Sequence, residues 1–122
     1  MDIRKKQRAV VTALEDVKGR DIVVYNVARL SPIFERVVIA TGDSTRQVRA
    51  LAESVCERLK GLGATVRGVE GAGSDWALVD LGDIVVHVMH PQARQYYRLE
   101  ELWGGKEVRL KRVQAVRRRV RR

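Results

Sequence analysis

The stretch Arg36-Val37-Val38-Ile39-Ala40-Thr41-Gly42-Asp43-Ser44-Thr45 joins two different hydrophobic patterns and decides the fold. Residues 36–40 are largely apolar on both faces of an extended chain, which predicts an interior strand. Ser44 and Gln47, three residues apart, form a capping-box pattern, so a helix is expected directly after the turn. The apolar residues that follow recur at helical spacing: Val48, Leu51, Ala52, Val55, Cys56, Leu59 and Leu62. A strand that leads into an amphipathic helix predicts a sheet covered by helices.

The remaining segments extend this pattern in both directions. They predict a helix over 3–18, a strand over 22–27, strands over 64–70, 76–81 and 84–90, and a helix over 91–103. Gly82-Asp83 is a two-residue turn with glycine first, which indicates a hairpin between the last two strands. The predicted order is αββαβββα, an α+β fold in which a mixed five-stranded sheet packs against helices.

Size and composition limit the class of protein. The chain has 122 residues, 45% of them hydrophobic, which suits one domain with a core. No apolar run reaches the roughly 18–20 residues that span a bilayer, and no secretory signal follows the charged first residues. Cys56 is the single cysteine, so neither an internal disulfide nor a zinc site is expected. These features predict a small cytoplasmic protein without a membrane partner.

The positive charge is concentrated at the end of the chain. Residues 106–122 hold nine of the 24 lysine and arginine residues against one acidic residue, so they carry +8 of the formal net charge of +9. This composition predicts a domain over 1–105 and a basic tail over 106–122. Such a tail is typical of a contact with nucleic acid, although it could also be a solvated terminus. The candidate RNA-binding residues are Arg112, Arg117, Arg118, Arg119, Arg121 and Arg122.

Catalysis has little support in the sequence. The chain contains no G-x-S-x-G, Walker or C-x-x-C motif. Gly42-Asp43-Ser44 could begin a nucleotidyl-transfer site, but no pair of acidic residues at D-x-D or D-x-E spacing follows to hold Mg²⁺. His87 and His90 lie three apart, which in a strand puts them on opposite faces, so they cannot bind one metal ion together. We therefore expect no enzyme, no cofactor and no metal site.

Most of the aromatic residues lie late in the chain beside charged ones. Aromatic side chains mixed with charges are typical of protein interfaces. The alternative is that these aromatics complete a small core. The candidate partner-binding residues are Asp75, Trp76, Asp80, His87, Arg94 and Tyr97.

Five blocks of the sequence together resemble a known family, the ribosomal silencing factors (RsfS, also called Iojap). The blocks are residues 21–24, 38–50, 70–71, 75–88 and 94–103, which include Ala40-Thr41-Gly42-Asp43-Ser44, Asp75-Trp76-Ala77-Leu78-Val79-Asp80 and Arg94-Gln95-Tyr96-Tyr97. The match spans about residues 5–104, in order and at the family's spacing. The resemblance implies a fold like that of nucleotidyltransferases without their active site.

The resemblance also implies a function and a partner. Such factors bind the large ribosomal subunit through its ribosomal protein number fourteen and block the joining of the small subunit, which represses translation. Organelle relatives assist assembly of the large subunit, so an assembly factor that uses the same docking site is the alternative. Family members are often homodimers when isolated. A ribosomal partner is expected to be basic, so Asp75 and Asp80 would offer the opposite charge.

Overall fold

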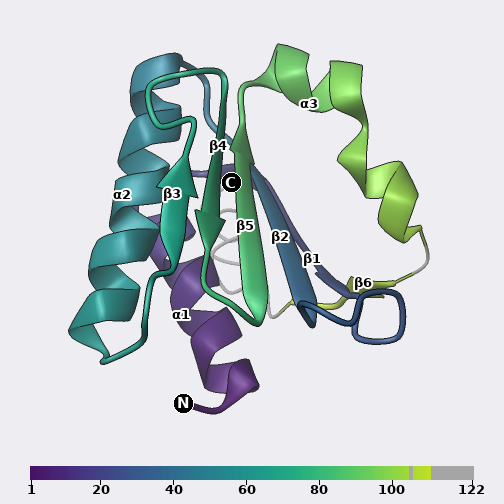
Figure 1. Ribbon diagram of the computed structural model, residues 1–122. Helices are drawn as coiled ribbons and strands as arrows, with labels where there is room; N and C mark the ends of the chain where they lie inside the picture. Colours follow the sequence, from purple (N-terminus) through teal and green to yellow (C-terminus); the bar gives the residue numbers. More distant parts are fainter. Residues whose placement is uncertain (105, 111–122) are drawn as a thin grey trace, which may run out of the picture.

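The computed structural model describes residues 1–104 and 106–110 (Figure 1). Its elements are α1 (Ile3–Asp16), β1 (Arg20–Asn26), β2 (Arg36–Thr41), α2 (Thr45–Gly61), β3 (Gly68–Glu70), β4 (Trp76–Asp80), β5 (Ile84–Met89), α3 (Pro91–Tyr97), a 3₁₀ helix η1 (Leu99–Trp103) and β6 (Glu107–Val108). The predicted α+β class is confirmed. The six arginines proposed for RNA binding, from Arg112 to Arg122, lie outside the described residues.

The strands form one mixed sheet in the order β3-β4-β5-β2-β1-β6. β2 runs parallel to β5, and the other neighbouring pairs are antiparallel. β2 therefore lies inside the sheet, and Val37 to Thr41 are all buried, as the apolar pattern of this segment predicts. The hairpin is also confirmed, because the Leu81 amide donates to the Ile84 carbonyl across Gly82-Asp83.

α1 and α2 pack side by side on one face of the sheet, which Figure 1 shows behind the strands. The main core lies between these helices and the sheet. Leu14 of α1 and Leu51 and Leu59 of α2 are fully buried there. We call this side of the sheet the closed face.

The turn before α2 is held by the predicted capping residues, with one difference. The Ser44 hydroxyl accepts from the Gln47 amide at 3.1 Å, as expected. The Gln47 side chain accepts from the amide of Asp43 instead of that of Ser44, at 2.6 Å. Its Nε2 donates to the carbonyls of Val17 and Lys18, so the same residue joins the start of α2 to the end of α1.

In the part of the chain that the structure describes, the sheet has six strands, so the predicted count of five is wrong. The extra strand, β6, pairs antiparallel with β1 through Val24↔Val108 and Tyr25↔Glu107. Val108 and Leu110 also pack against the main core. A two-residue strand inside a basic segment has no period of its own, and it exists because β1 offers an unpaired edge.

The predicted helix over 91–103 is two shorter helices. α3 ends at Tyr97, Arg98 adopts the left-handed conformation at φ +50°, and η1 follows. The strand predicted over 64–70 is likewise reduced to three exposed residues in β3. In both segments the hydrophobic spacing predicted the type of element correctly, but it did not predict the residues at which the helix and the strand begin and end.

Candidate functional site

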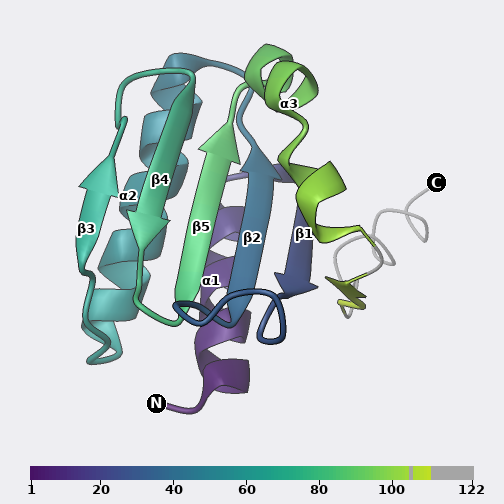
Figure 2. The ribbon, with the colours of Figure 1, turned by 45° about the vertical axis from the view of Figure 1, so that its right-hand side comes forward.

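Among residues 1–104 and 106–110, no helix covers β3 and β4 on the second face of the sheet (Figure 2). Figure 2 shows α3 and η1 in front of β2 and β1, whereas β3, β4 and β5 are open to the viewer. Strand alternation places Trp76, Leu78 and Asp80 of β4 on this side, because Ala77 and Val79 between them belong to the core of the closed face. On β5, Val85 and His87 alternate in the same way with Ile84, Val86 and Val88. We call the set Trp76, Leu78, Asp80, Val85, His87 and Tyr97 the open face.

Three of the predicted partner-binding residues meet on the open face. Trp76 Nε1 donates a hydrogen bond to His87 Nδ1 at 3.0 Å. The Trp76 ring also packs on Tyr97 of α3, with ring centroids 4.6 Å apart. The three side chains come from β4, β5 and α3, so the cluster forms only when the sheet and α3 are both in place. This juxtaposition supports the interpretation of these residues as one site.

The aromatic cluster is both anchored and accessible. Trp76 is half-buried and packs on the smaller core that contains Tyr25, Ile39 and Met89. Tyr97 remains 50% exposed. Large aromatic rings that are fixed on one side and exposed on the other are characteristic of interface residues with high binding energy.

His87 is held neutral by its surroundings. Burial lowers its pKa from 6.5 to about 4, because the imidazolium form would lose its hydration. Its cross-strand neighbours are the uncharged Leu78 and Ile39. The imidazole is therefore uncharged at neutral pH, and its Nδ1 accepts the Trp76 hydrogen bond.

The two predicted acidic residues lie at opposite ends of β4. Asp75 is exposed just before the strand, and its carbonyl accepts from the His90 amide at 2.8 Å. Asp80 is half-buried at the other end, and its Oδ1 accepts from the Gly82 amide at 2.8 Å, which holds the hairpin turn. Asp80 is one of the open-face residues, whereas Asp75 lies just before β4 and outside that set.

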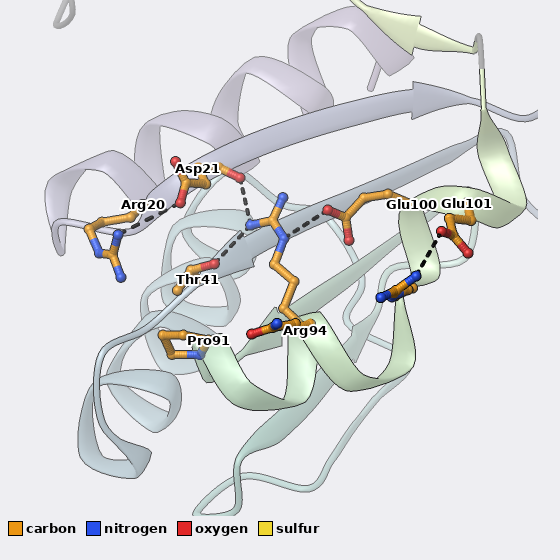
Figure 3. Close-up of a pocket in the computed structure, with 9 residues that line it drawn as sticks. Arg20, Asp21, Thr41, Pro91, Arg94, Glu100 and Glu101 are labelled. Atoms are coloured by element: carbon orange, nitrogen blue, oxygen red, sulfur yellow. Dashed lines mark hydrogen bonds and ion pairs between the residues drawn. The ribbon is translucent and has the colours of Figure 1, made fainter.

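Arg94 does not join the open face. Its side chain is only 12% exposed and lines a pocket of about 450 Å³ between α3, η1 and the ends of β1 and β2 (Figure 3). Its guanidinium donates to the Asp21 carbonyl at 2.7 Å, to Thr41 Oγ1 at 2.8 Å and to Glu100 Oε2 at 3.1 Å. Arg94 therefore fixes α3 and η1 to the sheet, which holds Tyr97 of the same helix over Trp76.

A β-bulge makes the Asp21 carbonyl available to Arg94. The register of β1 against β2 shifts between Arg20 and Val23, and Asp21 between them has φ +50°. Glu100 completes the arrangement, although its Oε1 is buried without a hydrogen-bond partner among the described residues. The bulge at Asp21 has no local signal that sequence analysis could detect. The same is true of the hydrogen bond between Arg94 and Asp21, which are 73 residues apart in the sequence.

Two residues beside the cluster were not among the predicted site residues. Leu78 lies between Trp76 and Asp80 on the same side of β4, and strand alternation alone could have identified it. Tyr96 is 79% exposed and packs edge-on against Tyr97, with centroids 5.0 Å apart. Both residues extend the apolar surface around Trp76.

Other chemistry is not assembled in the described residues. In residues 1–104 and 106–110, no group of three or more His, Cys, Asp or Glu side chains could hold a metal ion. Within the same residues, no helix has the length and apolar character to cross a membrane. His90 has a local role: its Nδ1 accepts from the Gln92 amide and so caps α3.

An exposed aromatic cluster on an open sheet, with acidic residues at both ends of β4, has the composition of a protein-binding surface. Comparisons with known proteins agree on the family. The family model described as "Ribosomal silencing factor during starvation" matches residues 1–122. The chain therefore belongs to the ribosomal silencing factor (RsfS) family.

Individual relatives give the same result. The ribosomal silencing factor RsfS of Chromobacterium violaceum is 49% identical over 108 residues, which are 88% of this chain and 88% of that one. A crystal structure of a Chromobacterium violaceum protein has a TM-score of 0.84 at 47% identity and covers 90% of this chain and 92% of that chain. A Mus musculus protein named "Mitochondrial assembly of ribosomal large subunit protein 1" is 34% identical over 98 residues, which are 77% of this chain and 43% of that protein.

Proposed function

We propose that this chain binds the large ribosomal subunit, through ribosomal protein number fourteen, and thereby prevents the small subunit from joining. The observation that carries the proposal is the open face, where Trp76, His87 and Tyr97 form one accessible cluster in a chain of the RsfS family. The result for the cell would be repression of translation.

The open face suits a basic protein partner. Asp75 and Asp80 supply negative charge at both ends of β4, and the half-exposed aromatic rings between these ends supply apolar area. Proteins that lie on ribosomal RNA are rich in cations, so opposite charges would meet across this interface. The aromatic rings would contribute most of the binding energy.

The proposed mechanism is steric and needs no catalytic group. A domain of about 100 residues has a radius of gyration of about 13 Å. Bound at the surface where the two subunits meet, a body of this size leaves no room for the small subunit. We therefore propose a non-enzymatic factor that acts by occupancy alone.

The first test is co-sedimentation with separated ribosomal subunits. The chain should pellet with large subunits and not with small ones. Two variants of the open face, Asp80→Lys and Tyr97→Ala, should weaken this binding, the second by about 2 kcal/mol if Tyr97 is a hot spot. Thermal melting must first show that each variant is folded, since Asp80 also holds the hairpin turn.

Matched controls lie on α2 and directly after it, away from the open face. Glu57→Lys makes the same charge change on an exposed position of α2, and Leu62→Ala truncates an exposed side chain just after that helix. Both controls should bind like the unchanged chain. Equal pelleting with both subunits would refute the proposed partner, and native affinity in both folded open-face variants would refute the proposed surface.

The second candidate function is assembly of the large subunit at the same docking site. The name of the Mus musculus relative, which refers to mitochondrial assembly of the ribosomal large subunit, favours it. A factor used in assembly should leave precursor large subunits in cells that lack it, even during rapid growth. A silencing factor should instead leave mature subunits and an excess of joined ribosomes under starvation.

We also propose that the basic tail contacts ribosomal RNA. Its cations, among them Arg117, Arg118 and Arg119, would neutralise phosphates and release counterions, which makes binding dependent on salt. The tail would then add affinity without changing which ribosomal protein the open face binds.

A further inference from the structure

The hydrogen bond between Trp76 and His87 determines which atoms the open face can offer to a partner. Trp76 has a single donor, Nε1–H, and it is directed to His87 Nδ1 at 3.0 Å. The indole therefore contributes apolar area to an interface but has no donor left for the partner. Its ring is also held between His87 and Tyr97, at centroid distances of 5.8 and 4.6 Å.

The same bond selects one form of the imidazole. A neutral histidine carries its proton on one ring nitrogen, and the other nitrogen is an acceptor. Because Nδ1 accepts from Trp76, the proton of His87 is on Nε2. Burial supports this state, since it lowers the pKa of His87 to about 4 and disfavours the doubly protonated ring.

The Nε2–H group remains available. In residues 1–104 and 106–110, the one side-chain nitrogen or oxygen that is both buried and without a hydrogen-bond partner is Glu100 Oε1. His87 Nε2 is therefore either hydrogen-bonded or exposed to solvent. Within the same residues Nε2 makes no hydrogen bond, so it must reach the solvent. His87 lies between Val86 and Val88, whose side chains are fully buried, on a strand paired on both sides. The donor is therefore rigidly placed.

We propose that His87 Nε2–H is a specificity-determining donor of the open face, and that it pairs with an oxygen acceptor of the bound protein. This inference rests on the proposed function, because it concerns the same surface. A lysine or arginine of the partner placed opposite His87 would meet a donor and lose its own hydration. The acidic residues near the two ends of β4 can accept cations, whereas the centre of the face requires an acceptor such as a main-chain carbonyl.

The first experiment reads the imidazole directly. Long-range ¹H–¹⁵N spectra of the free chain at neutral pH should show an unprotonated Nδ1 and a protonated Nε2 for His87. The variant Trp76→Phe removes the donor to Nδ1 but keeps an aromatic ring, so it should give a mixture of both tautomers. A protonated Nδ1 in the unchanged chain would overturn the inference, whatever the chain binds.

The second experiment separates the two hydrogen bonds of His87. His87→Gln provides one acceptor for Trp76 and one donor for the partner, so its affinity for large subunits should stay within about two-fold. His87→Met fills a similar volume without either group, so its affinity should fall about ten-fold. Equal affinities of the two variants would overturn the inference.

Two controls keep the outcomes distinct. If the unchanged chain does not bind large subunits, the proposed function fails, and with it the role of His87 in binding. If melting shows that His87→Met is unfolded, the Nε2–H resonance decides instead. On addition of isolated ribosomal protein number fourteen it should shift and exchange more slowly with water, and an unchanged resonance in a complex that forms would refute the proposal.

Discussion

The two faces of the sheet are built from alternate residues of the same strands, yet they differ in almost every physical property. On the closed face, Ala77, Val79, Val86 and Val88 are fully buried beneath α1 and α2. On the open face, Leu78 and His87 lie between them and keep part of their surface exposed, as do Trp76 and Asp80, whereas Val85 is buried. Under the proposed function, the closed face supplies stability and the open face binds the partner, and a slip of one residue in register would exchange the two sets of side chains.

The strongest destabilisation should come from a substitution on the closed face. Leu51 is fully buried and lies close beside Gly19 and Gly42. Leu51→Ala leaves a cavity there, so the free energy of unfolding should fall by about 3 kcal/mol. Urea denaturation measures this loss, and Leu62→Ala at the 46% exposed position after α2 should change it by less than about 0.5 kcal/mol. Similar losses in the two variants would contradict the contrast between buried and exposed positions.

The burial of His87 on the open face should make the free energy of unfolding depend on pH. Because the pKa of His87 is about 4 in the folded chain and 6.5 in the unfolded one, the unfolded state binds more protons between these values. Stability should therefore decrease as the pH falls from 6.5 towards 4, by at most about 3 kcal/mol from this residue. Its neighbours Trp76, Leu78 and Ile39 carry no titrating group.

Denaturation of the unchanged chain and of His87→Gln across this range isolates the effect. The variant cannot take up the proton, so its stability should depend less steeply on pH in this window. Parallel pH profiles of the two proteins would show that His87 is not held neutral by the fold.

Arg94 tests how the helices on the open side are held. Its three hydrogen bonds link α3 to β1, β2 and η1, so Arg94→Met should cost about 2 kcal/mol of stability and leave the Glu100 carboxylate unpaired. Binding to large subunits should weaken as well, because Tyr97 loses its fixed position. Arg98→Met removes an exposed ion pair with Glu101 on the same side and should cost less than about 0.5 kcal/mol. Equal costs would mean that the buried bonds of Arg94 do not hold α3.

The smallest predicted effect concerns the tail. The deletion should remove residues 111–122 and spare residues 106–110, because β6 and Leu110 belong to the fold. The shortened chain should keep its melting temperature, while the plot of log affinity for large subunits against log salt becomes flatter. An unchanged slope would identify the tail as a solubilising terminus.

Much of the fold could be predicted from local patterns. The helical spacing after Ser44, the apolar run at β2 and the Gly82-Asp83 turn each specify an element whose signal lies within a few residues. β6 and the break at Arg98 could not be predicted in this way, since the first depends on the distant edge of β1 and the second on one backbone angle. The likeness to nucleotidyltransferases stays a prediction.

The candidate site also contains residues that could be grouped from the sequence and one, Arg94, that could not. Trp76 and His87 could be grouped from the sequence because they lie on paired strands of one hairpin, and Tyr97 follows soon after them. Arg94, three residues before Tyr97, could not be separated from this group by its position in sequence. The Arg94 side chain points away from the open face because it donates hydrogen bonds to the Asp21 carbonyl at the bulge and to Thr41 Oγ1. Both acceptors come close to Arg94 only in the folded chain.

A subunit-joining assay tests whether the bound chain keeps the small subunit away. Large subunits are saturated with the chain, small subunits are added, and the yield of joined ribosomes is measured by sedimentation. The unchanged chain should lower this yield, and Tyr97→Ala at the same concentration should restore it in proportion to its weaker binding. An unchanged yield with the large subunit fully occupied by the chain would contradict the claim that occupancy blocks joining.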